Sequence, residues 1–71
     1  MMIWIEDKPG VWVLKTGWGV GRVMAGSFDP VVYYGSWNHH YLGVFPTLVR
    51  AKNAVSREAN RRLALARAAG F

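Results

Sequence analysis

The segment TGWGVGR, residues 16–22, has a glycine at every second position, and glycine-rich loops are a common means of cradling phosphate. A phosphate loop joins a strand to the N-terminus of a helix. Here the glycines lie between two strand-like runs, and their G-x-G-x-G spacing matches neither the dinucleotide-binding pattern nor the Walker pattern. We therefore interpret the segment as part of a hairpin in which glycines leave one face of a strand without side chains.

These three residues, Gly17, Gly19 and Gly21, are called the glycine lane. A lane without side chains lets a bulky group or another backbone lie flat on the strand. An aromatic residue such as Tyr34 or Trp37 is one candidate cover. The alternative is that the lane is a docking surface for a partner, with Trp18 as an exposed anchor.

His39 and His40 are the most conspicuous candidates for metal binding or acid–base chemistry. Adjacent side chains point apart in extended chain, and no Asp, Glu or Cys lies near them to complete a ligand set. They are interpreted as part of a turn, with a minor contact to phosphate or a partner left open. The chain has no cysteine and only four carboxylates, and its serines lack a nucleophile-elbow motif. We expect no catalytic residues, no metal, no cofactor and no enzymatic activity.

Positive charge is the strongest chemical signal, and it is confined to one part of the chain. From residue 1 to 45, three lysines and arginines balance three acidic residues, so the whole net charge of +5 comes from residues 46–71. The cations there are Arg50, Lys52, Arg57, Arg61, Arg62 and Arg67, opposed by Glu58 alone. An outward face of nearly one sign favours an anionic partner, either nucleic acid or an acidic protein surface, over simple solvation.

Residues 1–45 are predicted to form an antiparallel meander of three to five strands. The strand-like runs are 1–5, 11–15, 20–25, 31–37 and 41–45. Turn residues separate them at 6–10, 16–19, 26–30 and 38–40. These connections are too short for parallel crossovers, which leaves only hairpins.

A single basic amphipathic helix is predicted within 47–69, with its body at about 48–68. Thr47 is a suitable N-cap and Gly70 a suitable C-terminal stop. At 100° per residue, one stripe contains Leu48, Ala51, Val55, Ala59, Leu63 and Ala66. This stripe lacks Trp and Phe, which suits packing on a sheet better than insertion into lipid, so no membrane partner is expected. The arginines occupy the opposite side and its flanks.

With 71 residues, the chain is expected to form one domain, residues 1–71, of α+β class. No run is long and apolar enough to cross a bilayer and no secretory signal is apparent, so a cytoplasmic location is expected. The aromatic residues exceed what a small core readily hides, and such a surplus is typical of an interface. Trp12, Trp18 and Trp37 are the candidate aromatic contacts. A homodimer would be another way to bury them.

The stretch YLGVFPTLVRAKNAV, residues 41–55, resembles the strand-to-helix junction of small βββα domains. The residues that carry the resemblance are Leu42, Gly43, Phe45, Thr47, Ala51 and Ala54. Similar junctions occur in AP2-type and arm-type DNA-binding domains of phage integrases and in short phage proteins. The resemblance implies that arginines and tryptophans on the exposed sheet face read DNA. The matching positions are Trp12, Lys15, Arg22 and Trp37.

The chain departs from that pattern because its positive charge has moved from the strands to the helix. Our first hypothesis is a small non-enzymatic accessory protein of phage type that binds nucleic acid, its helix gripping phosphates. The alternative is a phage inhibitor of a host protein machine, anti-CRISPR-like or directed at RNA polymerase, acting by protein–protein contact. A third possibility is a homodimeric structural protein.

Overall fold

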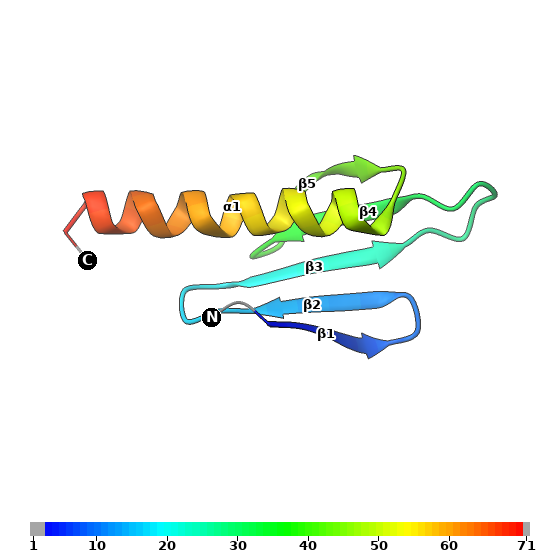
Figure 1. Ribbon diagram of the computed structural model, residues 1–71, viewed down its shortest axis with the longest axis horizontal. Coiled ribbons are helices and arrows are strands. Elements are labelled where there is room, and N and C mark those ends of the chain that lie inside the picture. Colours follow the sequence, from blue (N-terminus) through cyan, green and yellow to red (C-terminus); the bar gives the residue numbers. More distant parts are fainter. Residues whose placement is uncertain (1–2, 71) are drawn as a thin grey trace.

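The computed structural model describes residues 3–70 and consists of a five-stranded antiparallel sheet followed by one helix (Figure 1). The elements are β1 (Ile3–Lys8), β2 (Val11–Lys15), β3 (Val20–Ala25), β4 (Tyr33–Trp37), β5 (His40–Phe45) and α1 (Leu48–Ala68). Each strand pairs with the next along the chain. The predicted α+β meander with a C-terminal helix is confirmed. Met1 and Met2 of the predicted first strand, and Phe71, lie outside the described residues.

Most turns fall where turn residues predict them. Asn38 and His39 both have positive φ, 47° and 69°, which is the geometry of a two-residue type I′ hairpin turn. His40 already begins β5. The first turn is shorter than predicted, because β1 continues to Lys8 through an irregularity in its pairing with β2, and only Pro9 and Gly10 make the reversal.

Helix α1 begins and ends as predicted. The Thr47 hydroxyl accepts a hydrogen bond from the backbone N–H of Arg50 at 3.2 Å, which satisfies one of the free donors of the first turn. At the other end Gly70 has φ 88°, a left-handed conformation that glycine adopts without steric cost. Its N–H donates to the carbonyl of Arg67 at 3.1 Å.

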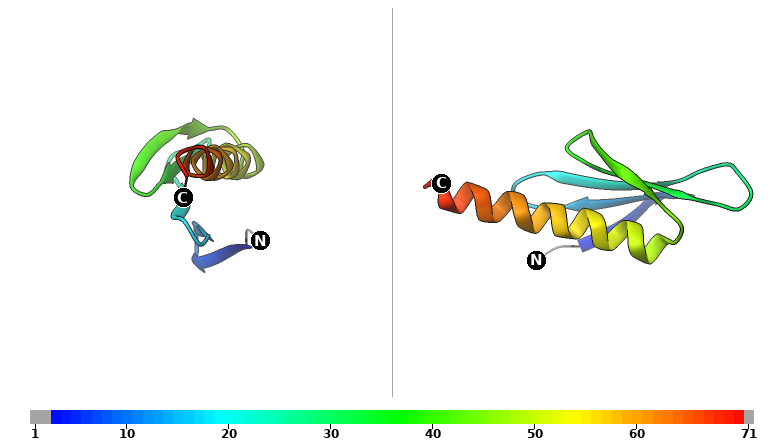
Figure 2. Two further views of the ribbon diagram at one scale, coloured as in Figure 1. Left: turned by 90° about the vertical axis from the view of Figure 1, so that its left-hand side faces the viewer. Right: turned by 90° about the horizontal axis from the view of Figure 1, so that it is seen from above.

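The helix lies across one face of the sheet, against β3, β4 and β5, and leaves the other face open (Figures 1 and 2). Register places Leu14, Gly21 and Trp37 opposite one another on three neighbouring strands, so their side chains share a face. That face is turned toward α1, because a Cβ at Gly21 would meet Val55.

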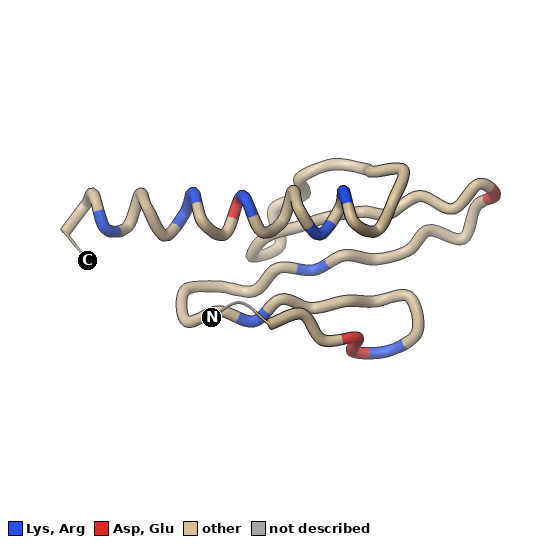
Figure 3. The backbone as a smooth tube through the Cα atoms, in the orientation of Figure 1, with Lys and Arg blue, Asp and Glu red and all other residues tan. Residues whose placement is uncertain are grey.

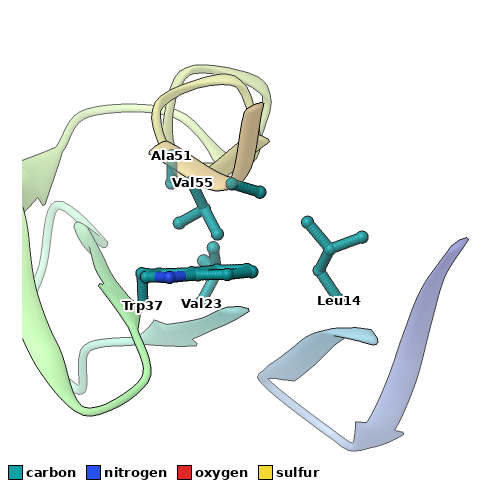
Figure 4. Packing of buried hydrophobic residues seen from close by; sticks show 6 residues of the cluster. Leu14, Val23, Trp37, Ala51 and Val55 are labelled. Carbon is teal, nitrogen blue, oxygen red and sulfur yellow. The ribbon is translucent and has the colours of Figure 1, made fainter. Parts of the chain in front are cut away.

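Val55 is the centre of the contact between helix and sheet. One of its methyl groups lies over Gly21 of β3 and the other over Gly35 of β4, so two bare backbone positions receive one branched side chain. Ala51 and Ala59, one turn before and after, are fully buried and keep the helix close. Figure 4 shows Ala51 and Val55 above Trp37, with Leu14 beside them.

The main buried cluster of the protein lies between helix and sheet, and Val11 and Val13 of β2, 8% and 6% exposed, are buried on the opposite face. The buried members of the cluster are Leu14, Val23, Trp37, Ala51, Val55 and Ala59. Half-buried side chains pack around it, among them Trp4, Trp12, Trp18, Tyr33, Leu42, Phe45 and Leu48. Much of the aromatic surplus noted in the sequence is thus used to widen a thin core.

Two of the three positions of the glycine lane are covered by side chains of the protein itself. Trp37 covers Gly19, as predicted, and Val55 of the helix covers Gly21. Gly17 is exposed, with no atom within 4 Å of a Cβ placed there. Tyr34 is not the cover, because register places it on the open face of the sheet opposite Met24. A partner docked on Gly19 and Gly21 is therefore excluded.

Helix α1 is longer than the strands beneath it. At 1.5 Å per residue its 21 residues extend about 32 Å, whereas a six-residue strand extends about 20 Å. The buried positions accordingly end at Ala59. Residues 60–70, called the helix arm, project past the sheet (Figures 1 and 2) and give the molecule its extents of 45 × 20 × 18 Å.

We expect Gly21→Ala to lower the free energy of unfolding by about 1–3 kcal/mol, because the new Cβ would overlap Val55 and push the helix off the sheet. Gly17→Ala is the matched control, since a methyl group there meets no other atom. Urea unfolding followed by circular dichroism measures both. Equal stability of the two variants would contradict the packing of Val55 on Gly21.

Candidate nucleic-acid interface

The six predicted cations all lie on α1, but they fall into groups with different surroundings (Figure 3). Arg50 and Arg57 are exposed on the part of the helix above the sheet. Arg61, Arg62 and Arg67 are exposed on the helix arm. Lys52 is half-buried at the flank of the helix. The predicted set is therefore distributed over three environments.

Arg50 and Arg57 stand on either side of a surface hollow of about 310 Å³. The hollow is lined by these two arginines together with Phe45, Asn53 and Ala54. Seven residues separate the arginines, which places them two turns apart and about 10 Å along the helix axis. Among residues 3–70, neither side chain forms an ion pair with a carboxylate. Two guanidinium groups that flank an amide are well suited to hold anionic oxygens.

Arg61 and Arg62 share the one acidic residue of the helix. Arg61 donates from Nε and from a terminal nitrogen to the two oxygens of Glu58, at 2.7 and 3.0 Å. Arg62 donates from Nε at 2.9 Å. The three side chains together keep a net charge of +1, and the contacts hold both guanidinium groups against the start of the helix arm. These two arginines are thus less available than sequence alone indicates.

The pairing explains the acidity of Glu58. Hydrogen bonds from Arg61 are the main cause that lowers the pKa of the Glu58 carboxyl from 4.5 to about 2; partial burial opposes the change and Arg62 adds to it. The same contact raises the pKa of the Arg61 guanidinium. The cluster is therefore fully ionised across the physiological range.

Lys52 lies over two tryptophan rings that belong to the edge of the sheet. Its Nζ is 5.5 Å from the ring centroid of Trp4 and 5.9 Å from that of Trp12, within the range of cation–π attraction. Trp12 also packs against Tyr33, with ring centroids 6.0 Å apart. Lys52 thus closes the flank of the core. Trp4 was not among the sequence candidates, because an apolar residue in a short strand carries no sign of a cation above it.

The tryptophans predicted to contact a partner are occupied inside the molecule. Trp37 is 2% exposed beneath the helix, so the expectation that it is an exposed contact is wrong. The indole N–H of Trp18 donates to the backbone carbonyl of Ala59 at 2.8 Å, which fastens the β2–β3 hairpin to the helix. Trp12 is half-buried under Lys52. Base stacking on these rings would require the core to open.

The sheet residues implied by the resemblance to integrase domains are divided between two faces. Trp12 and Trp37 share the face that packs against the helix, whereas Lys15 and Arg22 lie on the open face. Strand alternation is the reason: Trp12 and Lys15 are three residues apart on β2, and Arg22 pairs with Ser36, the neighbour of Trp37 on β4. The four side chains therefore do not form one reading surface.

Comparison of the chain with protein-family models, with curated proteins and with solved structures finds no match. Among residues 3–70, no three side chains of His, Cys, Asp and Glu gather closely enough to hold a metal ion. Over the same range, no helix combines the length and the apolarity needed to cross a bilayer. The geometry of the helix and of the open sheet face is thus the available guide to function.

The ion-pair cluster predicts a defined pH dependence. We expect Glu58→Gln to be less stable than the wild type at pH 7, with the difference constant down to about pH 4.5 and lost between 4.5 and about 2. The sign follows because the folded pKa lies below the unfolded one, so protonation of Glu58 at low pH removes the same attraction that the amide removes. Urea unfolding at a series of pH values measures it.

Glu6→Gln is the control, because it removes an exposed carboxyl that takes part in no ion pair within the described residues. A stability difference for Glu58→Gln that persists at pH 2 would contradict the assignment.

Proposed function

We propose that this protein is a small non-enzymatic nucleic-acid-binding protein whose helix α1 grips the phosphate backbone of a duplex. The observation that carries the proposal is the charge of that helix, which has six cations against one carboxylate over residues 48–68. The other half of the chain contributes no net charge, so the positive field is directed from one side of the molecule.

We propose a duplex rather than a single strand because the tryptophans pack within the protein. Proteins that hold single strands without sequence preference stack bases on exposed aromatic side chains. Here Trp37 is buried and Trp18 is hydrogen-bonded to the helix, so the basic surface lacks these rings. Arginines spaced along a rigid helix instead suit the regular phosphates of a duplex.

The helix arm is the second feature that supports a duplex. It projects past the sheet, and apart from its arginines it carries Asn60, Leu63, Leu65 and four alanines, Ala64, Ala66, Ala68 and Ala69. The major groove of B-DNA is about 12 Å wide and admits a single α-helix. An arm of this kind enters such a groove without collision from the sheet, while Arg50 and Arg57 remain nearer the phosphates outside it.

Phosphate contacts of this kind give affinity and strong salt dependence with little choice of sequence. An accessory role of phage type in the cytoplasm, as the resemblance implies, agrees with such binding. A host protein target and a homodimer stay as alternatives, and sedimentation of the free protein tests the latter.

The test is a fluorescence-anisotropy titration of a labelled 20-base-pair duplex at several salt concentrations. We expect Arg50→Gln with Arg57→Gln to weaken binding by at least about tenfold near 0.1 M salt, and to reduce the slope of log K against log salt by about two. Lys8→Gln with Lys15→Gln removes the same charge from the strands and is the matched control. No binding by the wild type at 50 mM salt, or equal losses in both pairs, would refute the proposal.

Release of the paired arginines should have the opposite effect. We expect Glu58→Gln to raise duplex affinity severalfold and to steepen the salt slope by about one, because Arg61 and Arg62 lose their internal partner. Glu6→Gln makes the same change in net charge away from the helix and should leave the slope unchanged. Weaker binding by Glu58→Gln would show that the ion pairs position these arginines rather than occupy them.

A further inference from the structure

The face of the sheet that the helix leaves open carries a groove built around Arg22. One hollow, of about 310 Å³, is lined by Val20, Arg22, Ser36, Asn38 and His39. A second, of about 290 Å³, is lined by Arg22, Met24, Tyr34, Gly35, Ser36, His39 and Tyr41. They share Arg22, Ser36 and His39, and together they are called the open-face groove. Its lining residues come from β3, β4 and β5 and from the turn between β4 and β5, and register places Arg22 and Ser36 on the face opposite α1.

Register explains why polar groups converge there. Arg22 of β3 stands directly opposite Ser36 of β4, which in turn stands opposite Tyr41 of β5. The tight turn brings His39 over the same row, and it is held in place because the side-chain oxygen of Asn38 accepts a hydrogen bond from the N–H of Val20 at 2.8 Å. A guanidinium, three hydroxyls and an imidazole therefore line one groove.

Arg22 has no acidic partner of its own. None of the ion pairs or side-chain hydrogen bonds among residues 3–70 involves it, although it is half-buried. Asp7 lines a smaller neighbouring hollow together with Arg22, but Lys8 lies beside it in that hollow. A guanidinium offers five donors, in a geometry that matches the oxygens of a carboxylate.

Beyond these polar groups, the open face around Arg22 is aliphatic and aromatic. Val20 and Met24, two residues away on the same face of β3, are 43% and 47% exposed. Val44 and Tyr41 of β5 are 51% and 66% exposed, and Ile3 and Ile5 continue the apolar face on β1. Contiguous exposed apolar side chains often mark interaction sites. One arginine within an apolar ring is the composition of an interface hot spot.

We propose that the open-face groove binds an acidic protein segment, in which an Asp or Glu side chain meets Arg22 and the neighbouring apolar residues cover Val20, Met24 and Tyr41. Nucleic acid is the less suitable occupant, because its interfaces are polar and densely positive, whereas this face has isolated cations among aliphatic groups. A second copy is less suitable too, because the lining of the groove offers no carboxylate to meet the Arg22 of another copy. This site is separate from the helix and does not depend on nucleic-acid binding.

The experiment begins with selection from a displayed library of random twelve-residue peptides on the wild-type protein, with Arg22→Gln as the parallel bait. We expect the wild type to enrich peptides in which an Asp or Glu is flanked by aliphatic or aromatic residues. The strongest peptide is then synthesised and titrated into the isotope-labelled protein by NMR. Shifts are expected at β3, β4 and the Asn38–His39 turn, with α1 unaffected.

Affinity should fall at least about tenfold in Arg22→Gln, and by a similar factor when the peptide carboxylate is replaced by its amide. Replacing the peptide carboxylate leaves the protein unchanged, so this measurement tests the contact with Arg22 even if Arg22→Gln is unstable. Lys15→Gln, a cation on the same face outside the groove, is the control and should bind as the wild type does.

Selected peptides without acidic residues, equal binding by Arg22→Gln, or shifts confined to α1 would each overturn the proposal. If instead a duplex shifts the same resonances of β3 to β5 and Arg22→Gln weakens duplex binding as much as loss of Arg50 and Arg57 does, the groove belongs to nucleic acid. Failure of duplex binding alone would refute the proposed function and leave this site standing.

Discussion

The packing of Val55 of α1 on Gly21 and Gly35 of the sheet is the contact that fixes how the helix lies on the strands. In a chain this short the main buried cluster is the one beneath the helix, so the helix must approach the sheet closely to exclude water. Two bare positions on neighbouring strands allow that approach, and one branched side chain fills both. Because a helix turns by 100° per residue, fixing Val55 inward also fixes Arg50 and Arg57 outward. The packing of Val55 on Gly21 and Gly35 thus determines that Arg50 and Arg57 point away from the sheet.

The same contact determines how far the helix reaches. Val55 and the buried alanines on either side of it lie in the first twelve residues of α1, so the remaining turns extend past the strands without a partner. The indole of Trp18 holds the last buried turn through the carbonyl of Ala59, and the helix arm begins immediately after it. Glu58 then draws Arg61 and Arg62 together at the base of the arm. The packing of the helix, its anchoring by Trp18 and the charge at the base of the arm depend on different residues. Mutations can therefore change each of them separately.

Local signals in the sequence predicted where the strands, turns and helix lie, but not which face of the sheet each side chain occupies. Thr47 and Gly70 delimit the helix because capping is decided by neighbouring residues, and the turn at Asn38 and His39 was predicted for the same reason. The tryptophans are different. Strand β2 is apolar on both faces, so alternation could not indicate that Trp12 turns inward, and only the register of four strands buries Trp37. Gly35 looked ordinary in sequence because its role depends on Val55, twenty residues away.

The sheet separates two surfaces of different chemistry and ties them to one another mechanically. Arg22 lies between Gly21 and Val23, both buried under the helix, so its backbone position is set by the core while its side chain faces the opposite side. A rigid backbone lowers the entropic cost of holding a ligand group there. The helix arginines and the open-face groove lie on opposite sides of one sheet, so the two proposed ligands would approach the molecule from opposite directions. A stiff sheet between the two surfaces would hold both ligands at a fixed separation without a moving part.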